Sequence, residues 1–361
     1  MGSAVMQDQD ICAELQEQVR AAADSGTALC IRGGGSKDFY GREPQGEKLE
    51  LGAHRGIVNY EPTELVVTAR SGTPLKEIEQ TLAEHKQMLA FEPPYFGEQA
   101  TIGGTVACNL SGPRRAYAGA ARDSLLGTKL LNGRGEVLSF GGEVMKNVAG
   151  YDVSRLMAGA MGTLGVLLEV SLKVLPRPEQ ELTLVQEVLS PSLALDEFIA
   201  WARLPVPISA TCYHDGQLFI RLCGTPSAIK VASDNIGGEA FTGETSDTLW
   251  QDLKNHQHAF FESERLLWRL SVASDAPPIR LDGDWLYEWG GAQRWLLSEV
   301  PMEDIREAAR AAGGHATLYR RGPRDEVFQP LSPGMMQIHR RLKQAFDPNG
   351  IVNPGRMYRE L

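Results

Sequence analysis

The sequence has little of what marks metal centres, disulfide-rich domains and membrane proteins. Its five cysteines are widely spaced, with no C-x-x-C pair and no group of cysteines and histidines. Because a cysteine-ligated iron–sulfur cluster needs closely grouped thiolates, the sequence excludes such a cluster from this chain. No apolar run approaches the roughly 20 residues that span a bilayer. We therefore expect a cytoplasmic protein with reduced thiols, and any membrane association to be made through a partner.

An excess of positive charge is also missing. The chain carries 36 Lys and Arg against 46 Asp and Glu, a formal net charge of −10. This balance gives no overall attraction to nucleic acid or to anionic lipid, so we expect neither as a partner. No G-x-x-x-x-G-K-[ST] motif occurs, which excludes a P-loop NTPase. The sequence also lacks a G-x-G-x-x-G motif with an acidic residue at the expected distance, so a Rossmann dinucleotide site is poorly supported.

The hydrophobic content is sufficient for more than one core. Hydrophobic residues make up 42% of 361 residues, and single cores stop growing at roughly 250 to 300 residues. The proline-bounded stretch near residue 178 separates a glycine-rich half from ordinary mixed α/β sequence. We therefore predict a first domain over 1–178 and a second over 179–330.

Periodicity predicts alternating helices and strands along the chain. We interpret 28–31, 49–51 and 57–60 as strands of one βαβ-like unit, and 125–131 with 137–140 as a hairpin around Asn132-Gly133. Helices are expected at 10–23, 75–84, 153–158, 193–202, 229–235, 247–256 and 335–346, and further strands at 65–69, 166–174, 182–189, 210–213, 218–222, 266–272 and 285–288.

Four segments rich in glycine and short polar residues provide the main functional signal: 33–36, 97–123, 147–152 and 159–166. Each offers backbone N–H groups rather than an acid–base constellation. The segments suit an extended ligand with a pyrophosphate and a polar heteroaromatic ring. Taken alone, the glycine triplet at 33–35 fits a plain turn equally well.

In order along the chain, the sequence contains R-G-G-G-S, A-T-I-G-G-T-V, A-G-A-A-R-D-S-L-L-G, G-Y-D-V-S-R-L, G-T-L-G-V-L-L-E and D-P-N-G-I-V-N-P-G-R-M. Together these motifs resemble the vanillyl-alcohol-oxidase/PCMH-type FAD-binding superfamily. Within it, H-R-G-I-V-N-Y-E-P-T-E-L and W-G-G-A-Q-R-W-L are similar to the FAD-binding subunits of bacterial glycolate oxidases. The resemblance implies an α+β fold, with a PCMH-type FAD-binding domain of two subdomains, a smaller α/β cap domain, and a segment 331–361 that returns to the FAD domain.

The resemblance also implies an activity and partners. Glycolate would be oxidised to glyoxylate in a complex with a larger flavin subunit and an iron–sulfur subunit, which passes electrons to the respiratory chain. Hydride would pass from the 2-hydroxy acid to the flavin while a base takes the hydroxyl proton. Two alternatives remain open: a self-sufficient FAD-dependent 2-hydroxy-acid dehydrogenase, and a scaffold subunit without flavin.

The resemblance assigns cofactor contacts residue by residue. No cysteine or histidine stands at the usual covalent anchor near the glycine triplet, and we expect a dissociable, non-covalent FAD; Met161 stands where the family often has Glu. The cofactor-binding residues expected from the resemblance are Arg32, Gly33, Gly34, Gly35, Ser36, Thr101, Ile102, Gly103, Gly104, Asn109, Gly119, Arg122, Gly165 and Val166.

No catalytic residue can be named from the sequence, and we predict no metal site. The histidine-rich motif of catalytic relatives is missing, and His256 with His258 is the nearest approach to it. We interpret these histidines and His315 as structural rather than metal ligands. Other candidates each have two interpretations: Cys108 as a buried thiol or a flavin contact, Arg320 and Arg321 as interface charges or a carboxylate site, and Lys146 and Tyr151 as packing or flavin-pocket groups.

Overall fold

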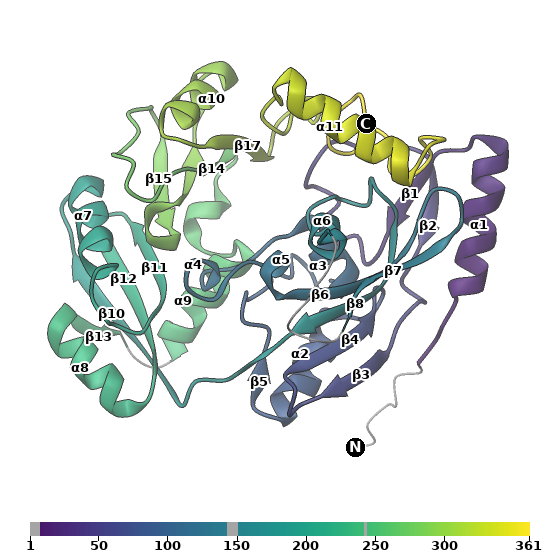
Figure 1. The fold of residues 1–361 in the computed structure, drawn as a ribbon. Coiled ribbons are helices and arrows are strands. Elements are labelled where there is room, and N and C mark those ends of the chain that lie inside the picture. Colours follow the sequence, from purple (N-terminus) through teal and green to yellow (C-terminus); the bar gives the residue numbers. More distant parts are fainter. Residues whose placement is uncertain (1–7, 143–150, 242–243) are drawn as a thin grey trace. The chain divides into compact units, whose positions relative to one another are not determined.

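The structure is a computed structural model that describes residues 8–142, 151–241 and 244–361 (Figure 1). Contacts divide the chain into two units. The first comprises Met1–Leu110, Ala120–Pro176 and Pro330–Leu361, and the second Ser111–Gly119 and Arg177–Gln329. The predicted divisions at 178 and 330 lie close to these, but the sequence placed 111–119 in the first domain.

The first unit is built on a five-stranded antiparallel sheet with the order β3-β4-β8-β6-β7. Its strands are β3 (Ile57–Glu61), β4 (Val66–Arg70), β6 (Leu125–Leu131), β7 (Val137–Gly141) and β8 (Val166–Lys173). Two smaller sheets accompany it: the parallel pair β1 (Leu29–Arg32) and β2 (Glu47–Glu50), and the antiparallel pair β5 (Gln87–Met88) and β9 (Leu175–Pro176). The hairpin expected at 125–140 is confirmed as β6 and β7.

Helices pack on this sheet through two apolar clusters. Leu75, Ile78 and Leu82 of α2 join Val170 and other buried residues of β4, β6 and β8 in one cluster. Leu15 and Val19 of α1 join β1 and β2 in the other. The helices of this unit are α1 (Cys12–Ser25), α2 (Leu75–Glu84), α3 (Ile102–Cys108), α5 (Ala121–Ser124), α6 (Val153–Met157) and α11 (Pro333–Phe346).

The second unit is built on an eight-stranded sheet with the order β13-β10-β12-β11-β15-β16-β14-β17, in which every pairing is antiparallel. Its strands are β10 (Gln180–Glu187), β11 (Ile208–His214), β12 (Gln217–Gly224), β13 (Glu239–Phe241), β14 (Leu267–Ser271), β15 (Asp284–Glu288), β16 (Gln293–Leu297) and β17 (His315–Arg320). Its helices are α4 (Arg115–Ala118), α7 (Pro191–Trp201), α8 (Pro226–Ile236), α9 (Glu244–Asn255) and α10 (Met302–Ala311), with short 3₁₀ turns at Ala259–Glu262 and Trp289–Gly291.

Segment Ser111–Gly119 belongs to the second unit because its contacts are there. Trp289 Nε1 donates to the Gly112 carbonyl oxygen at 3.1 Å, and the Arg115 guanidinium lies 4.4 Å from the centre of the Trp289 ring. Tyr117 and Thr211 hydroxyls are 3.2 Å apart. The small-residue run at 97–123 is thus shared between both units rather than forming one cradle.

Two further expectations are corrected by the strand pairing. The strands at 28–31, 49–51 and 57–60 do not form one βαβ-like unit, because β1 pairs with β2 and, through Leu29, with Val352, while β3 belongs to the five-stranded sheet. The second unit was expected to be α/β, but an antiparallel sheet makes it α+β. The overall α+β class is confirmed.

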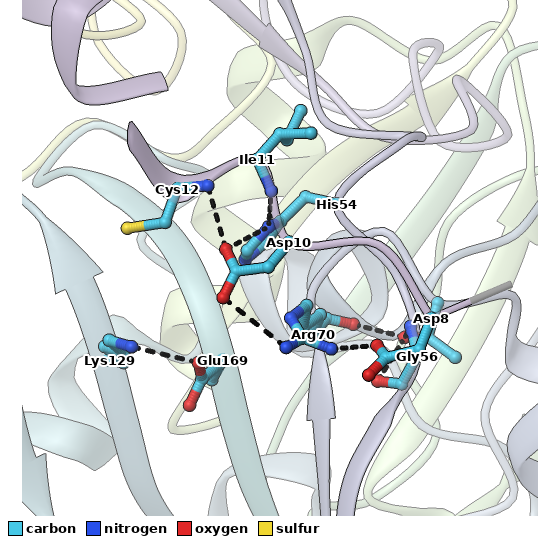
Figure 2. A network of polar contacts seen from close by, with 10 residues as sticks. Asp8, Asp10, Ile11, Cys12, His54, Gly56, Arg70, Lys129 and Glu169 are labelled. Atoms are coloured by element: carbon cyan, nitrogen blue, oxygen red, sulfur yellow. Dashed lines mark hydrogen bonds and ion pairs between the residues drawn. The ribbon is translucent and has the colours of Figure 1, made fainter. Parts of the chain in front are cut away.

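The N-terminal segment of the first unit is held by a polar network (Figure 2). Asp10 Oδ1 accepts from the Cys12 backbone N–H at 2.9 Å, and Arg70 lies between Asp8 and Asp10. The ring of His54 is fully buried, and its Nδ1 accepts from the Ile11 backbone N–H at 3.2 Å. This network fixes the chain immediately before α1 against the loop that precedes β3.

Candidate cofactor site

A cavity of the first unit lies where β1 ends. It encloses about 730 Å³ of space, including the part open to solvent. Four segments that are far apart in the sequence line it: the glycine loop after β1, α3 with its preceding residue, the loop at 161–165, and the C-terminal residues Asn353 and Arg356. The cavity therefore unites the glycine-rich segment 33–36 with parts of two others, 97–123 and 159–166, whereas Tyr151 and Asp152, the described residues of 147–152, do not line it.

The glycine loop needs glycine because another backbone passes directly beside it. A Cβ atom on Gly34 would lie 1.5 Å from the Gln99 carbonyl oxygen, and one on Gly33 would lie 2.5 Å from Thr101 Oγ1. Gly35 has a φ of +71°, in the region that favours glycine. The loop is thus fastened to the segment before α3, which a plain surface turn would not require.

Helix α3 supplies the adjoining wall. Thr101 caps it, with its side-chain oxygen accepting from the Gly104 N–H at 3.3 Å. Gly103 has no room for a side chain, since its Cβ would lie 2.5 Å from Ser71 Cβ. Asn109 ends the helix with a φ of 50°, and its Oδ1 accepts from the Arg122 backbone N–H at 3.0 Å.

The C-terminal segment closes the cavity from 322 residues away in sequence. Asn353 Oδ1 accepts from the Ile31 N–H at 2.7 Å, and its Nδ2 donates to the Met161 carbonyl oxygen at 2.7 Å. Arg356 donates to the carbonyl oxygens of Asp38 at 3.3 Å and of Arg42. One strand end and two loops are therefore held together by two side chains near the C-terminus.

The cavity carries a positive electrostatic character. Lys37 is only 6% exposed, and its Nζ donates to Ser36 Oγ at 3.3 Å. Burial lowers the pKa of Lys37 to about 8, partly opposed by the nearby Cys108 thiol. Burial in turn raises the pKa of Cys108. The thiol is thus protonated at neutral pH, and the cavity presents a desolvated cation.

Some of the predicted site residues line the cavity and others lie elsewhere in the structure. Asn109 lies at the end of α3, Arg122 lines a second cavity with Arg155 and His339, and Gly119 belongs to the second unit. Ile102 and Val166 are core residues of the first unit. The predicted residues that line the cavity are Arg32, Gly33, Gly34, Gly35, Ser36, Thr101, Gly103, Gly104 and Gly165.

Sequence reasoning assigned no role to several residues of the cavity. Lys37 follows the glycine loop directly, so a lysine at that place was a usable signal. Asn353 and Arg356 stand within the quoted N-P-G-R motif, but nothing in the sequence indicates that they reach β1. Cys108 and Met161, which the sequence singled out, both line the cavity.

The other candidates lie elsewhere. In the second unit, the half-buried His256 ring stacks on Phe261 at 4.0 Å between ring centres, and His258 Nδ1 accepts from the Phe260 N–H at 3.2 Å. Arg321 donates to the Phe261 carbonyl oxygen at 2.6 Å. Tyr151 is 97% exposed, which excludes a packing role, and Lys146 lies outside the described residues. Within the described residues, no group of three His, Cys, Asp or Glu could hold a metal ion.

Comparison with known proteins identifies the family. Residues 12–141 match the FAD binding domain family, and residues 321–357 match the C-terminal domain of FAD linked oxidases. The glycolate oxidase subunit GlcE of Escherichia coli (strain K12) is 50% identical over 357 residues, covering 99% of this chain and 100% of that protein. The chain belongs to the FAD-linked oxidases. It is an FAD-dependent oxidoreductase of the PCMH-type superfamily, and FAD is its cofactor.

Other relatives of this FAD-linked oxidase also support the family assignment. A D-lactate dehydrogenase of Anaerostipes hadrus is 36% identical over 88% of this chain and 81% of its own length. The glycolate oxidase subunit GlcD of Bacillus subtilis (strain 168) is 31% identical over 96% and 85%. A solved alkyldihydroxyacetonephosphate synthase shares the fold, with a TM-score of 0.65 at 16% identity over 95% of this chain and 75% of that one.

The residues of the cavity fit an FAD diphosphate. The backbone at Gly33–Gly35 has no side chains in the way of an approaching phosphate, and a buried ammonium lies in the same cavity. The described parts of the chain contain no helix with the length and apolar character needed to cross a bilayer.

Proposed function

We propose that this FAD-linked oxidase is the FAD-binding subunit of a multi-subunit glycolate oxidase, which oxidises glycolate to glyoxylate. One observation carries the proposal: the likeness to the E. coli glycolate oxidase subunit extends over 99% of this chain and 100% of the relative at 50% identity. The likeness therefore extends through both units of this chain. The proposed partners are a larger flavin subunit and an iron–sulfur subunit, which pass electrons to the respiratory chain.

FAD is proposed to bind without a covalent bond. The glycine loop Gly33, Gly34, Gly35 and Ser36 would hold the diphosphate through backbone N–H groups, with Thr101, Ile102, Gly103, Gly104 and Asn109 beside it. The backbone of Gly165 and Val166 would face the pyrimidine edge of the flavin, and Gly119 and Arg122 would belong to a later turn on the flavin side of the cofactor. Bound FAD supplies a two-electron acceptor for hydride. Cys108 lines the cavity as a thiol of raised pKa, which does not favour a thiolate attack on the ring.

The cavity offers little for acid–base chemistry. Among the described residues, the titratable side chains that line it, apart from arginines, are Lys37, Asp38 and Cys108, and none of the described histidines does so. A general base must lie within hydrogen-bond reach of the substrate hydroxyl, and Asp38 faces Arg32 at 3.2 Å instead. We therefore place the glycolate site mainly in the partner flavin subunit. We also propose a cytoplasmic location, with membrane association made through the partners.

The test compares the isolated chain with the assembled complex. Both are purified, their FAD content is measured from the flavin absorbance, and glycolate is added without oxygen. We expect the isolated chain to hold FAD in near 1:1 ratio but to be reduced by glycolate far more slowly than the complex. Equal rates of flavin reduction would contradict the division of labour between subunits.

A second candidate, a self-sufficient 2-hydroxy-acid dehydrogenase, is favoured by the 36% identity to a D-lactate dehydrogenase. The same experiment separates the two when D-lactate is added alongside glycolate. Fast bleaching of the isolated chain by either acid would establish this second candidate. A purified chain without flavin absorbance, and without affinity for added FAD, would instead indicate the scaffold subunit that the sequence left open.

A further inference from the structure

Lys37 is a buried cation without a carboxylate partner among the described residues. It is 6% exposed, and it lines the cavity directly after the glycine loop. An ammonium group has three N–H donors, and the described residues account for one of them, the 3.3 Å contact with Ser36 Oγ. Burying a charge without a partner is costly, so such a side chain is retained where a ligand supplies the opposite charge.

The other cations of the cavity already have partners. Arg32 Nε lies 3.2 Å from Asp38 Oδ2 and its Nη1 lies 3.9 Å from Glu50 Oε1. Arg356 donates to backbone carbonyl oxygens of the segment that follows the glycine loop. These arginines hold the cavity wall together, whereas the Lys37 ammonium has donors left for a ligand.

We propose that the Lys37 ammonium is the cation that pairs with the diphosphate of bound FAD. The ligand chemistry follows from position, because Lys37 adjoins the loop whose backbone lacks side chains at Gly33, Gly34 and Gly35. A diphosphate supplies the negative charge that would pair with the ammonium, because the carboxylate of Asp38 in the same cavity lies 3.2 Å from Arg32 Nε instead. The proposal rests on FAD binding, and it does not depend on glycolate being the substrate.

Proton uptake upon FAD binding follows from this pairing. Without FAD, burial holds the pKa of Lys37 at about 8. The groups around it are Ser36 and Asp38 on its own loop, Cys108 on α3, and Arg356 near the C-terminus. A diphosphate raises the pKa of Lys37, so the complex binds a proton that the free protein has released above pH 8. FAD affinity is therefore constant below about pH 8 and falls as the pH rises above it.

The first experiment measures the dissociation constant of FAD by flavin fluorescence for the flavin-free protein and for Lys37→Met. Loss of one charge-assisted contact predicts a dissociation constant about 10- to 100-fold higher. Lys48→Met, which removes an exposed lysine of β2, is the matched control and should bind as the wild type does. Equal effects of both substitutions, or no effect of Lys37→Met, would overturn the proposal.

Competition by ADP tests whether Lys37 contacts the diphosphate or the flavin ring, because ADP contains a diphosphate but no flavin. We expect Lys37→Met to weaken competition by ADP by the same factor as FAD binding. Unchanged ADP affinity beside weakened FAD binding would place Lys37 at the flavin instead and reject the proposal.

Two further readouts separate binding from misfolding. Without FAD, Lys37→Met should unfold at a higher temperature than the wild type at pH 7, because it removes a desolvated charge. Lys37→Arg should recover part of the affinity and abolish its fall between pH 8 and 9, since arginine stays charged. A Lys37→Arg variant that kept the wild-type pH dependence would show that another group is responsible.

Discussion

At the scale of single residues, Gly34 is the position of the cavity that leaves the least room for a side chain. Gly34→Ala would place a methyl group 1.5 Å from the Gln99 carbonyl oxygen, so the glycine loop and the segment before α3 must separate. We expect the free energy of unfolding to fall by about 1–3 kcal/mol, the usual range for overpacking. FAD affinity should fall more than tenfold, which fluorescence titration would measure.

Gly52→Ala is the control for that substitution. No atom lies within 4 Å of a Cβ at Gly52, and its φ is outside the range that favours glycine. The stability and FAD affinity of Gly52→Ala should therefore match the wild type. A Gly34→Ala protein that binds FAD as tightly as this control would show that the loop is not part of the cofactor site.

Some residues of the cavity could be predicted from the sequence and others could not. The glycine loop, Thr101 and Gly103 lie in motifs whose residue types already favour a close backbone approach. Lys37 was not assigned because a lysine beside a glycine loop is usually solvated, and its burial depends on Cys108 and the C-terminal segment. Burial is a property of the assembled fold, and no local pattern encodes it.

At the scale of elements, the C-terminal segment is attached to β1 and to the loop at 161–165 by Asn353. Asn353→Ala removes the acceptor of the Ile31 N–H and the donor to the Met161 carbonyl oxygen. Leaving buried backbone groups unpaired costs about 1–3 kcal/mol. We expect that loss in denaturant unfolding, together with weaker FAD binding.

Asn349→Ala is the comparison for this variant, because its exposed side chain makes one long contact of 3.4 Å to the Ala23 carbonyl oxygen. It should change stability by less than about 0.5 kcal/mol. Similar losses in both variants would mean that the turn as a whole, and not Asn353, holds the segment.

The attachment of the N-terminal segment should depend on pH through His54. Burial, with a contribution from Arg70, lowers the pKa of His54 below its ordinary value of 6.5. The unfolded chain therefore takes up the proton first, and stability that is complete above pH 6.5 falls as the pH drops below it. His54→Asn keeps an acceptor for the Ile11 N–H but cannot titrate, so its unfolding free energy should fall less between pH 6.5 and 5.

The exposed His85 serves as the control. His85→Asn should keep the wild-type pH dependence of unfolding, measured by circular dichroism at each pH. If His54→Asn loses stability as steeply as the wild type below pH 6.5, groups other than His54 cause the loss of stability in acid.

Elements with strong end signals were the most predictable from sequence. Helix α2 spans the expected 75–84. Helices α7, α8 and α11 begin at Pro191, Pro226 and Pro333, two or three residues before the expected starts at 193, 229 and 335, because the Ser or Thr before each proline is a start signal that was not used in the prediction. Helix α3 was missed because it consists of small residues without an apolar stripe, and β17 because its neighbour β14 is distant in sequence.

At the scale of the whole molecule, each unit has apolar clusters of its own, and the cavity lies in the first. Ligand binding stabilises the unit that binds, by about 2.7 kcal/mol at a free concentration of 100 times the dissociation constant. Calorimetry with and without FAD should therefore show that the heat absorbed by the first unit moves to higher temperature.

Gly34→Ala provides the check on that assignment. FAD should shift its thermogram less than that of the wild type at the same concentration. If FAD moves the whole thermogram of both proteins equally, the cofactor is not bound where the glycine loop lies.

The division into units was the part of the fold that sequence reasoning could locate but not fully draw. The change of composition near residue 178 is visible in the sequence, and the division near 330 was implied by the family resemblance. The place of Ser111–Gly119 in the second unit depends on Trp289 and Thr211, which lie far along the chain. The antiparallel order of the eight-stranded sheet could not be predicted either, because a side-chain pattern reveals a strand but not which strand pairs with it.

The place of Asn353 and Arg356 in the cavity has a consequence for biosynthesis. A ribosome that adds roughly 5–20 residues per second completes β1 and the glycine loop early. The side chains that secure them follow much later, since Asn353 lies 322 residues beyond Ile31 and Arg356 lies 318 residues beyond Asp38. The nascent chain therefore cannot complete its cofactor cavity until residues 353 and 356 have been translated, and we expect FAD to be loaded only after that point.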